Sequence, residues 1–250
     1  MKYSFCIETM FEDVPIYDRI ALAKDCGADA VEFYNPALYD CRRVASILEK
    51  LDIPLIECGI VDGWNVRLNA PIEIVEKNLG QTIALAKELG CTSFTGHVAE
   101  GDIDPVLEKN VLVDNLRRLA EICEKEDVTI AIEMLNSLYD NRGYLLDTTK
   151  KAVDVLKRVG SPNIKLLYDC YHTQLMEGNL IKTVQKNFEF IGHFHGSGVP
   201  GRDELFHGEV NYKALVEAIE KAGYTGWFGL EYWPSYDNAQ SLRDVMTYLK

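Results

Sequence analysis

The sequence predicts a single-domain (β/α)8 barrel, or TIM barrel, over residues 1–250. Three observations predict it. The length of 250 residues is that of one such barrel. Short apolar runs alternate with amphipathic helical stretches along the whole chain, and eight of each can be distinguished. This alternation is typical of a parallel sheet, and eight mostly apolar strands favour closure into a barrel over an open doubly wound sheet.

The expected strands are six or seven residues long and are mostly apolar. No G-x-G-x-x-G motif follows the first of them, which argues against a dinucleotide-binding fold. In order they are YSFCIE (3–8), ADAVEF (28–33), IPLIECG (53–59), TSFTGH (92–97), VTIAIEM (128–134), IKLLYD (164–169), FIGHFH (190–195) and GWFGLE (226–231).

The expected helices fill the segments between these strands. Several end at a glycine shortly before the next strand, as in ELGCTSF and KRVGSPNIKL. Glycine supplies the positive φ that a helix C-cap requires. The helices are expected at 15–26, 38–51, 72–89, 106–126, 148–159, 176–187, 211–222 and 238–249.

Composition narrows the function classes. The formal charge of −13 argues against non-specific nucleic-acid binding, which needs a clustered cationic surface. Neither a signal core nor an apolar stretch long enough to span a bilayer is found. The seven cysteines form no Cys-x-x-Cys pair, which favours a reducing compartment. We therefore expect a cytoplasmic protein with no nucleic-acid or membrane partner; a homo-oligomer is consistent with such a barrel.

Four metal-competent residues end neighbouring strands in the second half of the chain. Glu133 ends the fifth strand, Asp169 the sixth, His195 the seventh and Glu231 the eighth. In a (β/α)8 barrel these strand ends meet around one mouth, where the active site is built. Three carboxylates crowded there require shifted pKa values or a neutralising cation. Each acid taken alone could instead cap a helix or form a salt bridge.

The ligand set of three oxygen donors and one imidazole predicts the type of metal. It suits one divalent ion, Mn²⁺ or Mg²⁺, with Co²⁺, Fe²⁺ or Zn²⁺ as substitutes. His193 and His195 both face inward because residues two apart in a strand share a face. His195 lies nearer the mouth and is the expected ligand. His193, one layer deeper, is expected to be a hydrogen-bonded supporting or core histidine.

Further polar and aromatic residues flank this cluster. His172, expected in the loop after the sixth strand, could reach a substrate hydroxyl or cap the next helix. Arg202 could clamp a carboxylate or sugar oxygens, or form a surface ion pair with an acidic neighbour in the chain. Asn136 could orient the site or cap a turn. Trp64 and His97 could line the pocket.

Four stretches resemble a known family: DRIALAKDCGADAVEF, GYLLDTTKKAVDVLKRVGSPNIKLLYDCYHTQLMEGNL, IGHFHGSGVPGRDELFHGEVNY and GYTGWFGLEYWPS. The chain resembles the xylose isomerase-like (AP endonuclease family 2) barrels, and among them the hydroxypyruvate isomerases and ketose 3-epimerases. The resemblance implies Glu133, Asp169, His195 and Glu231 as metal ligands, with the two glutamates also acting as acid/base catalysts. Hydroxypyruvate isomerases usually carry glutamine at the position of His195, whereas the epimerases carry histidine.

The activity that this resemblance implies is that of a divalent-metal-dependent isomerase or epimerase. Its substrate would be a small sugar or hydroxy-keto acid, converted through a metal-bound cis-enediolate. A lyase or dehydratase that acts on an oxidised sugar or C-glycoside through the same enolate is the alternative. An abasic-site endonuclease is disfavoured by the charge of −13, and a non-catalytic sugar-binding module is disfavoured by the four expected ligands.

Overall fold

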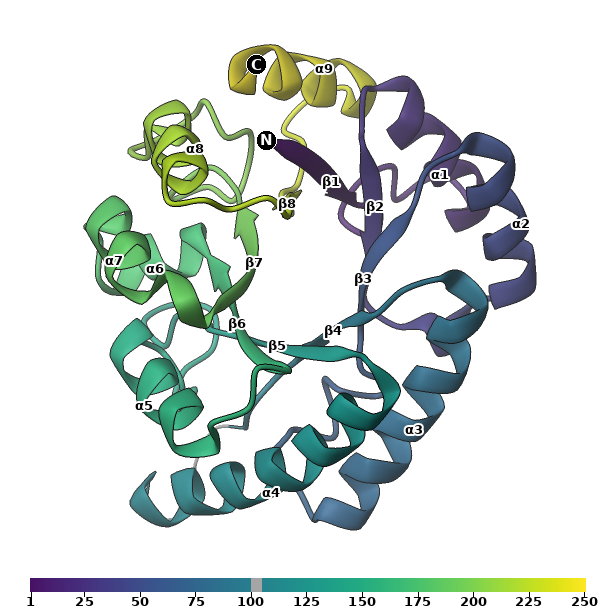
Figure 1. Cartoon of the computed structure of the whole chain (residues 1–250). Helices are drawn as coiled ribbons and strands as arrows, with labels where there is room; N and C mark the ends of the chain where they lie inside the picture. Colours follow the sequence, from purple (N-terminus) through teal and green to yellow (C-terminus); the bar gives the residue numbers. More distant parts are fainter. Residues whose placement is uncertain (100–104) are drawn as a thin grey trace.

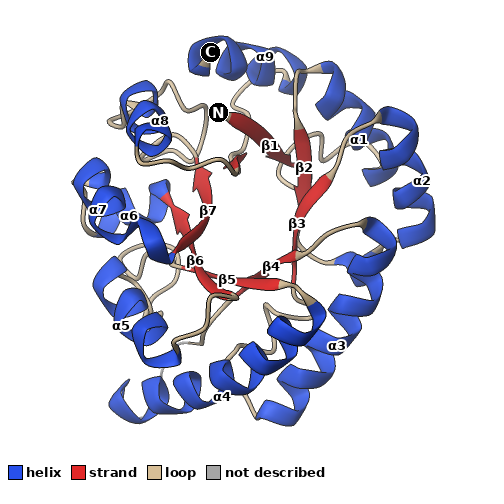
Figure 2. Ribbon diagram, viewed as in Figure 1, coloured by secondary structure: helices blue, strands red, loops and turns tan. Residues whose placement is uncertain are grey.

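The computed structural model describes residues 1–99 and 105–250 and shows a closed parallel barrel surrounded by helices. Figure 1 looks into the ring of strands, and the colours of Figure 2 separate the inner strands from the outer helices. The strands pair in chain order, and β1 closes the ring by pairing in parallel with β8. The predicted (β/α)8 barrel is therefore confirmed.

Each predicted strand is present, with ends that differ from the prediction by at most two residues. Parallel pairing places the carboxyl ends of the strands at the same end of the barrel, where the polar residues are gathered. The strands are β1 (Lys2–Cys6), β2 (Ala30–Phe33), β3 (Leu55–Gly59), β4 (Ser93–Gly96), β5 (Thr129–Glu133), β6 (Ile164–Asp169), β7 (Ile191–Gly196) and β8 (Trp227–Leu230).

The helices form the outer layer. Gly90 and Gly160 have φ values of 69° and 77° at the C-caps of α3 and α5, as the glycine pattern predicts. The α-helices are α1 (Ile16–Asp25), α2 (Cys41–Leu51), α3 (Ile72–Leu89), α4 (Pro105–Glu126), α5 (Thr149–Val159), α6 (Cys170–Met176), α7 (Leu180–Asn187), α8 (Tyr212–Lys221) and α9 (Asn238–Leu249), with 3-10 turns η1 (Pro36–Leu38) and η2 (Phe188–Phe190).

The predicted helix 176–187 is wrong in its first turn, because two helices follow β6. Gly178 and Asn179 adopt φ values of 61° and 52°, and this left-handed backbone separates α6 from α7. The missed helix α6 begins directly after Asp169, whose side chain accepts hydrogen bonds from the amides of Tyr171 and His172. An acidic N-cap of this kind satisfies amides that the first helical turn leaves unpaired.

Apolar side chains fill the layer between barrel and helices. Phe194 and Phe228, neighbours on β7 and β8, are fully buried with stacked rings whose centroids lie 6.2 Å apart. Tyr168 of β6 meets Phe194 edge to face. This places Phe194 in the helix-facing layer, as strand alternation predicts for the residue between two inward histidines.

All seven cysteines are buried and free. Among the described helices, none combines the length and the apolar character needed to cross a membrane.

Gly59, the last residue of β3, generates a stability prediction. A Cβ there would collide with the backbone carbonyl of Tyr34, which follows the neighbouring strand β2. We expect Gly59→Ala to lower the free energy of unfolding by about 3 kcal/mol, because backbone cannot give way as a flexible side chain does. Gly80, in helix α3 with open space around it, is the matched control. Gly80→Ala should raise stability by about 0.5–1 kcal/mol. Thermal and denaturant unfolding measure both, and equal effects would contradict the prediction.

Candidate active site

A cavity of about 370 Å³ lies at the carboxyl ends of the strands. Its walls come from several strands and from the loops that follow them. Tyr34 follows β2, Trp64 follows β3, and Trp233 follows β8. Most of the polar residues singled out in the sequence line this cavity: His97, Glu133, His172, His195, Arg202 and Glu231.

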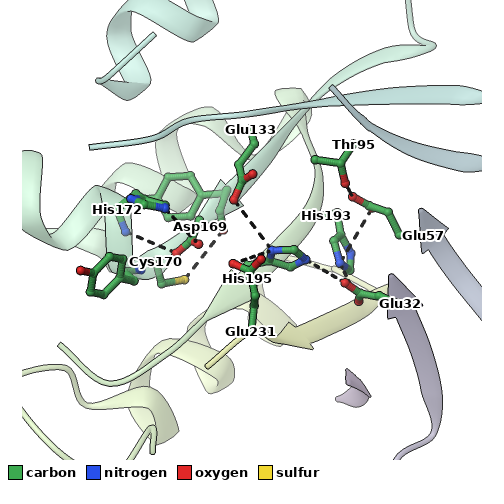
Figure 3. Close-up of polar contacts among 12 residues, drawn as sticks. Glu32, Glu57, Thr95, Glu133, Asp169, Cys170, His172, His193, His195 and Glu231 are labelled. Atoms are coloured by element: carbon green, nitrogen blue, oxygen red, sulfur yellow. Dashed lines mark hydrogen bonds and ion pairs between the residues drawn. The ribbon is translucent and has the colours of Figure 1, made fainter. Parts of the chain in front are cut away.

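The structure brings the four expected ligands together at the base of the cavity. Glu133, Asp169, His195 and Glu231 are all buried, and each offers one ligand atom within 4.8 Å of the others. His195 Nδ1 lies 4.0 Å from Glu133 Oε1 and 3.7 Å from Glu231 Oε2. Figure 3 shows the two glutamates approaching the imidazole from opposite sides, with Asp169 on a third.

Local structure orients Asp169. It is the last residue of β6 and also the N-cap of α6. Its Oδ1 accepts the amide hydrogens of Tyr171 at 2.7 Å and His172 at 3.3 Å. Because Oδ1 is occupied by these bonds, Oδ2 is the oxygen available to the cluster.

Hydrogen-bond donors orient the two glutamates. His97 Nε2 lies 2.9 Å from Glu133 Oε2. The Tyr34 hydroxyl donates to Glu231 Oε1 at 2.6 Å, and Arg202 Nη2 donates to Glu231 Oε2 at 2.9 Å. Burial alone would raise the pKa of Glu231, but Arg202 and His195 outweigh burial and hold this pKa well below its usual range. Glu231 is therefore ionised, with both oxygens engaged.

The cluster fits a divalent cation. Two buried ligand atoms that face each other, Glu133 Oε1 and His195 Nδ1, have no hydrogen-bond partner among the residues that the structure describes. Burial raises the pKa of Asp169, the direction expected for a carboxyl that lacks full compensation. Burial would lower the pKa of His195, but the carboxylates of Glu32 and Glu231 raise it well above its usual value. Three carboxylates and one imidazole that converge in this way could hold a divalent ion.

The position of His172 differs from the sequence-based expectation, and Asn136 holds it in place. His172 lies in the first turn of α6 rather than in a loop, and its Nε2 is buried without a partner beside the cavity. Asn136 is fully buried and does not line the cavity. Its backbone N–H and side-chain amide reach His172 Nδ1 at 3.1 and 2.7 Å, while its Oδ1 accepts the amide hydrogens of Tyr139 and Asp140. Asn136 thus orients His172 and caps a turn.

The protonation state of His172 follows from these bonds. Two donors from Asn136 meet Nδ1, so Nδ1 is the acceptor nitrogen and Nε2 carries the proton. Burial lowers the pKa of His172, and the positive charge of Arg202 acts in the same direction. A neutral imidazole therefore presents an N–H donor to the cavity.

Arg202 reaches into the cavity instead of pairing with its acidic neighbours in the chain. It adopts a φ of 57° in the loop after β7. Its guanidinium lies over the rings of Tyr171 and Trp233, with centroid distances of 4.9 and 5.0 Å. Nη2 pairs with Glu231, whereas the buried Nε has no partner. The guanidinium is thus held by two rings and keeps one N–H direction for a ligand.

Trp64 and His97 form one wall of the cavity. Their rings meet edge to face with centroids 5.0 Å apart. Trp64 is 55% exposed, so it stands at the rim, and Arg67 lies over its ring at 4.1 Å. His97, bonded to Glu133, stands deeper.

Sequence reasoning missed several residues that surround the site. Tyr34 and Trp233 reach the site from loops and carry no distinctive local pattern. Glu32 and Glu57 could have been found, because each is a charged residue inside an otherwise apolar strand. Such residues are almost never fully buried without partners. Both are buried in the barrel interior, and Glu32 contacts His195.

His193 lies one layer below the cluster, as expected. Its Nε2 is 3.0 Å from Glu32 Oε1 and 3.9 Å from Glu57 Oε2. It is buried, and its hydrogen bond runs to Glu32 rather than toward the three carboxylates at the mouth.

Known proteins share this architecture. The family model of the xylose isomerase-like TIM barrel matches residues 20–250. A hydroxypyruvate isomerase of Escherichia coli is 30% identical over 97% of this chain and 97% of its own length. A 2-oxo-tetronate isomerase of Pectobacterium atrosepticum is 28% identical over 93% of this chain and 92% of its own. The crystal structure of an AP endonuclease, family 2, from Brucella melitensis superposes with a TM-score of 0.93 at 27% identity, covering 99% of this chain and 98% of that one.

The raised pKa of His195 predicts that protons compete with a metal ion. Below this pKa, Mn²⁺ must displace a proton from the imidazole, so apparent affinity should fall about tenfold for each pH unit from neutral pH downward. Isothermal titration in buffers of different ionisation enthalpy measures both affinity and proton release. His207→Gln changes an exposed histidine outside the cavity and should leave the slope unaltered. Affinity that is independent of pH between about 6 and about 7.5 would contradict a histidine ligand.

Proposed function

The chain belongs to the xylose isomerase-like TIM barrel family, and we propose that it is a divalent-metal-dependent isomerase or epimerase of small hydroxy-keto acids or sugars. One observation carries the proposal. Two buried glutamates, each oriented by its own donor, face each other across a cluster with the ligands of a divalent ion. The isomerases among the relatives support the reaction class, and their names support a hydroxy-keto acid as substrate.

Glu133, Asp169, His195 and Glu231 would hold the ion, and we expect Mn²⁺. When bound, it supplies a Lewis acid to a substrate that carries a carbonyl next to a hydroxyl. Side chains of the protein would transfer the protons and bind the substrate.

Glu133 and Glu231 are the proposed acid/base pair. Glu133 is bonded to His97 through Oε2, so the two lone pairs of Oε1 are left for the ion and for a proton from a substrate carbon. Glu231 stands on the opposite side of His195 and can exchange a proton with the other face. Return of the proton to the neighbouring carbon isomerises the substrate. Return to the opposite face of the same carbon epimerises it.

His172 and Arg202 are the proposed substrate-binding donors. Within residues 1–99 and 105–250 the Nε2–H of His172 forms no hydrogen bond, its neighbour Asp169 Oδ2 lying 3.8 Å away, and it can donate to the oxygen on which negative charge develops. The free Nε–H of Arg202 can bind a substrate carboxylate or hydroxyl. Trp64 and His97 form a wall of the cavity on which the substrate can pack.

Loss of either glutamate should abolish proton exchange. We expect Glu133→Gln and Glu231→Gln each to reduce turnover by about 10²–10⁴-fold, because an amide cannot act as a base. The assay supplies hydroxypyruvate, a 2-oxo-tetronate or free ketoses with Mn²⁺ in D₂O and follows deuterium next to the carbonyl by NMR. Glu177→Gln, whose carboxylate bonds Thr149 outside the cavity, is the control. Near-normal exchange in either active-site variant would refute the assignment.

The shape of the Arg202 side chain generates a second prediction. Lysine keeps the positive charge, but it lacks the planar fork of arginine. It therefore cannot pair with Glu231 and at the same time donate a second N–H to the substrate in the same plane. Arg202→Lys should therefore lower kcat/KM about 10- to 100-fold, as expected for loss of one charge-assisted hydrogen bond. Arg43→Lys is matched to it, since Arg43 stacks on Tyr17 at 3.9 Å on a helix remote from the cavity. Equal kinetics for both variants would remove Arg202 from substrate binding.

A further inference from the structure

A second polar cluster lies inside the barrel, beneath the four expected ligands. Glu32 projects from β2 across the interior and meets both histidines of β7. Its Oε1 lies 3.0 Å from His193 Nε2, and its Oε2 lies 2.8 Å from His195 Nε2. All three residues are buried. Figure 3 shows this cluster on the side of His195 away from Asp169.

The contact with Glu32 assigns different tasks to the two nitrogens of His195. A carboxylate only accepts hydrogen bonds, so Nε2 must carry a proton that it donates to Glu32. Nδ1 then remains for the cluster, where it lies within 4.0 Å of Glu133 and Glu231 and has no hydrogen-bond partner in the described part of the chain. This ring orientation points Nε2 at Glu32 and Nδ1 at the cluster.

We propose that Glu32 is a positioning residue that makes His195 an Nδ1 ligand of the metal. The proposal rests on the proposed metal centre and deepens it. A ligating imidazole whose second N–H donates to a carboxylate has a fixed orientation and a more basic ligating nitrogen. Glu32 would thus act on the metal through His195 without touching it.

Glu32 is itself held in place. Ser4 on β1 donates to Oε1, the oxygen that also faces His193, so Oε2 is left to His195 alone. His193 therefore orients the carboxylate of Glu32, which in turn orients the imidazole of His195. Burial would raise the pKa of Glu32, but the two histidines outweigh burial and keep this pKa well below its usual range.

Gly229 on β8 leaves the space in which this pair sits. A Cβ there would lie 2.5 Å from His195 Cδ2 and 2.9 Å from Glu32 Oε1. Any other residue at this position would push the imidazole and the carboxylate from their present positions. Gly229 therefore provides a steric test that changes no hydrogen-bonding group.

The test measures Mn²⁺ affinity by electron paramagnetic resonance in wild type, Glu32→Gln and Glu32→Ala. Loss of such a supporting partner should raise the Kd about 10- to 100-fold. Glu57→Gln is the matched control: Glu57 is equally buried and lies 3.9 Å from His193, but its hydrogen bonds run to Ser93 and Thr95, and it acts on His195 through charge alone. Its Kd should stay within a factor of about three. Gly229→Ala should weaken Mn²⁺ binding in the same direction as Glu32→Gln.

A second readout does not depend on the metal. The chain has five histidines, so ¹⁵N-histidine NMR can resolve each ring, with His195→Gln to identify the signal. We expect a downfield Nε2–H proton on His195 in metal-free protein and in protein loaded with Mg²⁺. That signal should vanish in Glu32→Ala and persist in Glu57→Gln.

The outcomes separate this proposal from the proposed function. Wild-type protein that binds no Mn²⁺ would refute the metal centre, and with it the task assigned to Glu32. Tight binding by the wild type that is unchanged in folded Glu32→Gln and Gly229→Ala would overturn the role of Glu32 alone. A His195 Nε2 that carries no hydrogen-bonded proton would also overturn it, whatever the activity of the enzyme.

Discussion

The arrangement of side chains in this structure depends on carboxylates that are buried inside a closed barrel. Glu32, Glu133, Asp169 and Glu231 are each 5% exposed or less. A buried charge costs several kcal/mol unless partners compensate it. The structure supplies partners from different strands and from the loops that follow them: Ser4 and His193 to Glu32, His97 to Glu133, Tyr34 and Arg202 to Glu231. His195 stands between the lower carboxylate and the upper three, and the remaining negative charge is what a divalent cation would neutralise.

The two glutamates at the mouth of the barrel accept different numbers of hydrogen bonds. Glu231 has hydrogen bonds to both oxygens and a strongly lowered pKa, so its anionic form is well stabilised. Glu133 is bonded through one oxygen and keeps the other free. Chemically equivalent side chains are thus made different by their surroundings, as acid/base partners in an active site need to be.

Much of the barrel and of its mouth could be predicted from sequence because both depend on local periodicity. Short apolar runs between amphipathic stretches located the strands, and their last polar residues identified Glu133, Asp169, His195 and Glu231. The contact of Glu32 with His195 could not be predicted, since it joins residues 163 positions apart across the barrel. The break at Gly178 and Asn179 was missed because helical periodicity continues on both sides of it. The burial of Asn136 could not be predicted, since it depends on the position of α6.

Asp169 also determines which changes of chain length the site can tolerate. Its side chain starts α6, and His172 follows in the first turn. Successive residues of an α-helix are rotated by roughly 100°, so one residue inserted between them would turn the imidazole away from the cavity. Insertions beyond Met176, where the helix ends, would leave that angle unchanged. A change in the length of the loop between α6 and α7 would therefore leave His172 in place, whereas a change in the three-residue spacing from Asp169 to His172 would not.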